Sequence, residues 1–176
     1  LKIADREDFT YSEVDNLGKV TEKNDYFDIH IQEILNHELV DKEAIKSANF
    51  KVAIDAVNST GGLVLPQLLK ALGVETVYEL FCEPNGEFPH NPEPLPENLT
   101  EISKTVIENN ADIGIVVDPD VDRLALVCED GSMFGEEYTL VAVADYILSQ
   151  RVGNTVSNLS STRALRDVTE KAGGEY

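Results

Sequence analysis

The chain has 176 residues, 42% of them hydrophobic, which is enough for one well-packed domain with adjoining pieces. Its formal net charge of −19 excludes nucleic-acid binding through a basic surface, because that mode needs clustered Lys and Arg, and favours cations as partners. The chain has no apolar run near the ~20 residues that cross a bilayer, and its first residues lack the pattern of a secretion signal. We therefore expect a cytoplasmic protein with no membrane partner, whose cysteines, Cys82 and Cys128, are free thiols.

The apolar pattern predicts the secondary structure along the chain. The first ~20 residues are polar and aperiodic, as in a connector between domains. Beyond them, helical spacing and then alternating β-rich and helical stretches follow one another. In chain order we expect helices over 26–39 and 42–48, strand 50–57, helix 63–72, strand 74–80, helix 99–110, strands 113–117 and 124–128, helix 137–150, strand 155–159 and helix 161–172.

This alternation predicts an α/β fold with a mostly parallel sheet and helices on both faces. Five of the seven prolines lie between Cys82 and Pro96, which predicts an ordered surface loop there. We expect Asn98 to cap the helix that follows this loop, and Ser160 and Ser161 to cap the last helix. Because the chain begins at Leu1 rather than Met and its last residues, 173–176, have the pattern of a strand that is just starting, we expect a fragment of a longer protein.

Three aspartates follow the buried strand 113–117 with a period of two: Asp118, Asp120 and Asp122. In an extended loop this spacing turns all three carboxylates the same way. Their mutual repulsion requires a cation or protons, and hard oxygen ligands select Mg²⁺ or Ca²⁺ over zinc and copper. Arg123 is a salt-bridge partner for these aspartates and, beside a metal, a planar donor for phosphate oxygens. The sequence therefore predicts a magnesium site at the end of a sheet strand, where ligands bind in open α/β folds.

Three other interpretations compete with the magnesium site of an enzyme; the first fails on its residues and the second fits less well. In a calcium-binding helix-loop-helix, the three aspartates and Glu129 would take loop positions one, three, five and twelve, but position six is Arg123 instead of glycine and both flanks are predicted strands. In an aspartyl-phosphatase, Asp118 would be the nucleophile, but such a site needs a lysine and acidic residues on later strands. The third is a divalent-cation-binding module without catalysis.

The motifs together resemble the α-D-phosphohexomutase superfamily, whose members include phosphoglucomutases, phosphomannomutases and phosphoglucosamine mutases. The resemblance runs through three parts of the chain in order: Phe50–Asp55 with Asn58–Gly62, Asn85–His90 with Pro92–Leu99, and Ala111–Gly114 leading into Asp118–Arg123. It implies that residues 1–20 are the tail of a preceding domain or connector, that 21–134 form domain two, with the metal loop and a β-hairpin after it, and that 135–176 are the truncated start of domain three, a second α/β domain.

The resemblance also implies a reaction. A phosphoserine in domain one would phosphorylate a hexose or hexosamine phosphate, and the bisphosphorylated sugar would return its other phosphate, which interconverts the 1- and 6-phosphates. Asp118, Asp120 and Asp122 would hold the Mg²⁺, and Arg123 would contact phosphate. Pro119 departs from the glycine of many members, and its fixed φ is compatible with metal binding. We expect the fragment to be inactive alone, because the phosphoserine, sugar-binding and phosphate-binding loops lie outside it.

Several other polar residues have structural interpretations. His90-Asn91-Pro92 imitates the end of the phosphoserine motif, but Pro89 stands where the serine would be, so we interpret His90 as structural. Ser59 and Thr60, before a helix, are expected to be caps. His30 and His37 are expected to share an exposed or half-buried helix face without binding metal.

Overall fold

Four strands form one sheet at the centre of the protein in the computed structural model, which describes residues 2–176. The strands are β1 (Lys51–Asp55), β2 (Thr76–Leu80), β3 (Ile113–Val117) and β4 (Leu124–Cys128), in the spatial order β2-β1-β3-β4. β1 runs parallel to both β2 and β3, whereas β4 is antiparallel to β3. The predicted α/β class with a mostly parallel sheet is confirmed, and the metal loop itself joins the two strands of the β3–β4 hairpin.

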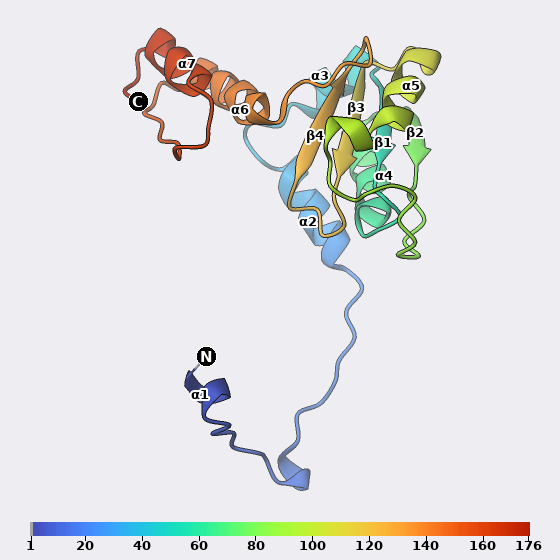
Figure 1. The fold of residues 1–176 in the computed structure, drawn as a ribbon, viewed down its shortest axis with the longest axis vertical. Helices are drawn as coiled ribbons and strands as arrows, with labels where there is room; N and C mark the ends of the chain where they lie inside the picture. The colour runs from blue at the N-terminus through green and yellow to red at the C-terminus, as the bar shows by residue number, and fades with distance from the viewer. Residues whose placement is uncertain (1) are drawn as a thin grey trace.

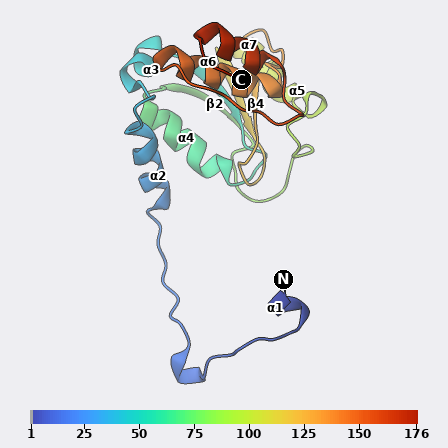
Figure 2. The same cartoon turned by 90° about the vertical axis from the view of Figure 1, so that its left-hand side faces the viewer.

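Helices cover both faces of this sheet because the side chains of each strand alternate between them (Figure 2). Ala53 of β1 faces α5 (Thr100–Asn109) and packs in one buried cluster with Ile102 and Val106 of that helix. Val52 and Ile54 face the other way, onto Leu69 of α4 (Gly61–Leu72). The same cluster includes Ile45 of α3 (Lys42–Ala48). Two apolar layers therefore fix the sheet, and with it the loops at its carboxyl edge.

The amino-terminal residues run away from the sheet (Figure 1). Residues 2–30 are exposed throughout, and their regular structure before residue 26 is limited to α1 (Lys2–Asp5) and the 3-10 turn η1 (Val14–Asn16). Leu1 lies outside the described residues, so the expected connector is seen from Lys2 onward. α2 (Tyr26–Leu35) follows and buries Ile31, but it ends four residues earlier than predicted, where the chain turns at His37.

The carboxy-terminal helices form a small core of their own. α6 (Glu136–Gln150) and α7 (Ala164–Ala172) pack through Val141, Ala144 and Leu165. The strand predicted over 155–159 is wrong: among residues 2–176 no strand pairs with this segment, and its one ladder-like bond is from the Thr155 N–H to the Glu175 carbonyl, at 3.0 Å. A β-rich composition gives a strand only where a neighbouring strand satisfies the backbone groups.

The caps predicted for two of the helices are also wrong. α5 begins at Thr100 after the 3-10 turn η2 (Pro96–Asn98), and the Asn98 side-chain amide donates to the Glu93 carbonyl at 2.8 Å instead of capping the helix. The hydroxyls of Ser160 and Ser161 donate to Asn158 Oδ1, at 3.0 and 2.9 Å, before α7 begins. Asn, Ser and Thr side chains bond nearby groups as readily as helix ends, so local composition does not decide between the two.

None of the helices among residues 2–176 combines the length and apolar character needed to cross a membrane.

Candidate metal centre

The three predicted aspartates meet at the carboxyl end of β3. Asp118 follows the buried residues Val116 and Val117 and is itself only 4% exposed, whereas Asp120 and Asp122 are exposed on the loop between β3 and β4. One carboxylate oxygen from each lies within 4.8 Å of those of the other two. The structure therefore brings together the side chains that the period-two spacing predicted, and the buried one is fixed by the sheet.

The loop is folded by bonds from its own backbone to Asp118. The Arg123 N–H donates to Asp118 Oδ1 at 3.1 Å, and the Val121 N–H donates to the Asp118 carbonyl at 3.2 Å. These bonds close a tight turn in which Val121 takes a φ of 62°, a left-handed conformation that β-branched residues rarely adopt. The buried carboxylate thus organises the turn as well as offering a metal ligand.

A second segment of the chain holds the loop from outside. Ser59 Oγ and Thr60 Oγ1 both donate to the Pro119 carbonyl oxygen, each at 2.7 Å. Neither side chain caps α4, so the prediction that they are caps is wrong. A Cβ on Gly61 would lie 2.5 Å from Val117 Cγ2, so glycine allows this turn to approach β3. The β1–α4 turn therefore clamps the aspartate loop, about 60 residues away in sequence.

The electrostatics of the group suit a divalent cation. The pKa of Asp122 is raised by the hydrogen bond that its protonated form shares with Asp118, and then by the negative charges of Asp120 and Asp118. A cation close to Asp122 would favour its charged form and so oppose this rise in pKa. Carboxylate oxygens are the hard ligands that Mg²⁺ and Ca²⁺ prefer, so the residues present fit Mg²⁺.

Arg123 lies against these carboxylates, and its side chain is 51% exposed. Its Nε is 3.7 Å from Asp118 Oδ2 and 3.7 Å from Asp122 Oδ1. Its Nη1 donates to Glu93 Oε2, a partner that the sequence analysis did not identify. Glu93 comes from the proline-rich loop 82–96, thirty residues earlier, so no local spacing could indicate the pair.

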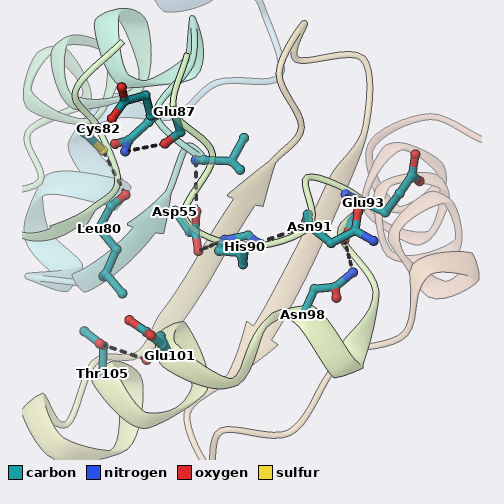
Figure 3. A network of polar contacts seen from close by, with 12 residues as sticks. Asp55, Leu80, Cys82, Glu87, His90, Asn91, Glu93, Asn98, Glu101 and Thr105 are labelled. Atoms are coloured by element: carbon teal, nitrogen blue, oxygen red, sulfur yellow. Dashed lines mark hydrogen bonds and ion pairs between the residues drawn. The ribbon is translucent and has the colours of Figure 1, made fainter. Parts of the chain in front are cut away.

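Asp55 is a further buried acid at this edge of the sheet, at the end of β1 (Figure 3). Its Oδ2 lies 3.0 Å from His90 Nε2, and its Oδ1 accepts the Val57 N–H at 3.0 Å. Burial is the main reason that the pKa of Asp55 is raised, while the Val57 bond and His90 oppose the shift. The ring of His90 also meets Phe81 edge-on, with centroids 5.5 Å apart. The sequence feature that could have indicated this pair is the charged residue Asp55 at the end of a buried strand.

The remaining histidines do not add ligands. Because α2 ends at Leu35, His37 lies beyond the helix and does not share a helix face with His30, so that prediction is wrong. His37 Nδ1 instead accepts the Leu39 N–H at 3.2 Å. Among residues 2–176, the three loop aspartates are the one group of His, Cys, Asp and Glu with converging ligand atoms. Their flanks are strands β3 and β4, which excludes the calcium-binding helix-loop-helix.

Comparisons with known proteins agree with this arrangement. The family described as phosphoglucomutase/phosphomannomutase, alpha/beta/alpha domain II, matches residues 28–131. The probable phosphoglucosamine mutase of Methanopyrus kandleri is 31% identical over 170 residues, 96% of this chain and 36% of that protein. The phosphoglucomutase of Neisseria gonorrhoeae is 35% identical over 178 residues, 99% of this chain and 36% of that protein.

A solved structure has the same fold. The crystal structure of a phosphoglucomutase/phosphomannomutase family protein from Burkholderia thailandensis superposes with a TM-score of 0.72 at 30% identity, over 88% of this chain and 33% of that one. The chain thus spans about a third of the length of the curated relatives it matches.

Proposed function

Because the chain belongs to the phosphoglucomutase/phosphomannomutase family, we propose that it supplies the metal site of a phosphohexomutase. The enzyme interconverts the 1- and 6-phosphates of a hexose or hexosamine through a phosphoserine and a bisphosphorylated sugar. In this proposal, residues 21–134 are the family's second domain, residues 1–20 are a connector from the first, and residues 135–176 begin the third. The chain covers about a third of its relatives, so we propose that these 176 residues have no mutase activity alone.

The site residues have distinct tasks in this proposal. Asp118, Asp120 and Asp122 hold Mg²⁺, which when bound offsets negative charge on the phosphoryl group that is transferred. Arg123 offers planar N–H donors to phosphate oxygens from the same loop. Asp118 also keeps the loop folded through the Arg123 N–H, so the metal ligand and the phosphate contact are held in one rigid turn.

One observation carries the proposal: the oxygens of three aspartates, spaced by two residues, lie within 4.8 Å of one another at the end of β3. A divalent cation would offset the repulsion within such a group, and phosphoryl transfer depends mainly on positioning and charge stabilisation. A strand end at the carboxyl edge of an open α/β sheet is also where ligands of this fold class bind.

The test is an assay of the full-length enzyme on glucose, mannose and glucosamine 1-phosphates with and without Mg²⁺. We expect the 6-phosphate of at least one sugar to form, and Asp120→Ala to abolish both turnover and Mg²⁺ binding measured by calorimetry. Release of inorganic phosphate without isomerisation would indicate an aspartyl-phosphatase instead. Magnesium binding without any conversion would leave a cation-binding module.

A further inference from the structure

We propose that Glu93 is a positioning residue that orients the guanidinium of Arg123 toward a phosphate group, an inference that rests on the proposed function of the aspartate loop. The observation behind it is the ion pair between Arg123 Nη1 and Glu93 Oε2, which joins the proline-rich loop to the metal loop. The two side chains are about half exposed, at 51% and 49%, so the pair contributes little to stability and its main effect is on orientation.

The contacts of Arg123 divide its donors between two tasks. Nε faces the carboxylates of Asp118 and Asp122 at 3.7 Å, and Nη1 donates to Glu93. Within residues 2–176, Nη2 donates to no protein group, so its N–H bonds are available to a ligand. A guanidinium held on two sides presents its third side in a fixed direction, as planar recognition of a phosphate requires.

Glu93 can direct Arg123 because its own backbone is held. The Asn91 side-chain oxygen accepts the Glu93 N–H at 3.1 Å, and the Asn98 side-chain amide donates to the Glu93 carbonyl at 2.8 Å. Just before this turn, His90 is anchored to the buried Asp55 of β1 (Figure 3). The loop thus links the end of β1 to the arginine through a series of short, ordered contacts.

Space for a ligand lies beside the pair. A cavity of about 240 Å³ is lined by Glu93, Asp122 and Arg123 together with Leu124 and Glu136. Glu93 and Arg123 therefore meet at the wall of a hollow that Asp122 also lines, and a phosphoryl group there would meet the arginine already oriented. Holding a long side chain in its bound conformation removes an entropy cost from ligand binding and from the transition state.

The experiment compares Glu93→Gln with Glu87→Gln in the full-length enzyme. Both variants remove one negative charge from the same exposed loop, but the Glu87 side chain has no polar partner among residues 2–176. We expect Glu93→Gln to lower kcat/KM for the sugar phosphate by roughly fivefold, the scale of an exposed ion pair, and Glu87→Gln to leave it unchanged. In an Arg123→Ala background, Glu93→Gln should have no further effect, because its influence acts through the arginine.

A second readout does not depend on turnover. The ¹⁵N relaxation of the Arg123 Nε–H resonance, assigned by its disappearance in Arg123→Lys, should report an ordered side chain that becomes mobile in Glu93→Gln and stays ordered in Glu87→Gln. An unmodified enzyme without mutase turnover overturns the proposed function, and the relaxation data still decide whether Glu93 orders the arginine. Two results would overturn the role of Glu93 and leave the proposed function standing. One is normal turnover with an equal effect of Glu93→Gln in the unmodified enzyme and in Arg123→Ala, and the other is an Nε–H signal that Glu93→Gln does not change.

Discussion

Replacing Gly62 with alanine tests how closely the start of helix α4 packs against the end of β2. A Cβ built on Gly62 would lie 2.2 Å from the carbonyl oxygen of Cys82 and 2.7 Å from both its carbonyl carbon and its Cα. All three atoms belong to the backbone, so no side-chain rotation can relieve the overlap. The first turn of α4 would have to move, and with it the hydroxyls of Ser59 and Thr60 that hold the aspartate loop.

The expected magnitude is a balance of two effects. Alanine is normally favoured over glycine by about 1 kcal/mol in a helix interior, which is an upper limit for Gly62 in the first turn of α4. Forcing an extra carbon into a packed site costs about 1–3 kcal/mol, and an overlap with fixed backbone belongs at or beyond the upper end of that range. We therefore expect Gly62→Ala to lower the free energy of unfolding by about 2 kcal/mol and Tm by roughly 4–8 °C for a chain of this size.

The assay is thermal unfolding followed by circular dichroism, with Gly18→Ala as the matched control. A Cβ on Gly18 would meet nothing within 4 Å, so the control should stay within about 0.5 kcal/mol of the unmodified chain. If Gly62→Ala were as stable as the control, or more stable than the unmodified chain, the close approach of α4 to Cys82 would be wrong. The packing that positions the hydroxyls of Ser59 and Thr60 against the metal loop would then be wrong as well.

Two further changes probe the site and its pH dependence. Replacing Ser59 by Ala together with Thr60 by Val removes both hydrogen bonds to the Pro119 carbonyl, at about 1 kcal/mol each. The Mg²⁺ affinity measured by calorimetry should therefore fall roughly tenfold or more. The control Ser47→Ala removes a hydroxyl bond within α3 and should leave the affinity unchanged. Equal affinities would refute the clamp. Burial raises the pKa of Asp55 above its ordinary value of 3.8, so the folded chain holds this proton more tightly than the unfolded chain. The free energy of unfolding therefore falls as pH rises from 3.8 through the raised pKa. Asp55→Asn should remove that fall, which is checked by urea unfolding of both chains from about pH 4 to about pH 7. If the free energy of unfolding of the variant changed with pH in parallel with that of the unmodified chain, the prediction would be wrong.

The parts of the fold that could be predicted are those with a strong local period. β3 and β4 have the predicted bounds because both are continuous apolar runs of five residues interrupted by the aspartate loop. The aspartates converge because their period of two is retained after a strand that fixes the first of them. The segment 155–159 has a similar β-rich composition, but its outcome depends on a partner strand, which its own residues cannot specify.

The contacts that hold the metal loop in place could not be predicted, because they join residues far apart in the sequence. Ser59 reaches Pro119 across 60 residues, His90 reaches Asp55 across 35, and Arg123 reaches Glu93 across 30. None of these side chains belongs to a repeating pattern, and Ser59 has the same local setting as an ordinary helix cap. Only the topology of the sheet brings their loops to one edge.

Three segments at this edge each supply a different part of the site. The aspartate pattern alone is therefore not a complete site. The β3–β4 loop supplies the carboxylates and the arginine, the β1–α4 turn fixes the backbone between the first two aspartates, and the loop 82–96 fixes the direction of the arginine. Mutual repulsion among the carboxylates and the left-handed Val121 both oppose this loop conformation in the absence of a cation. Contacts from two other segments offset that opposition, so part of the cost of ordering the loop is met by the protein itself and binding does not have to supply all of it.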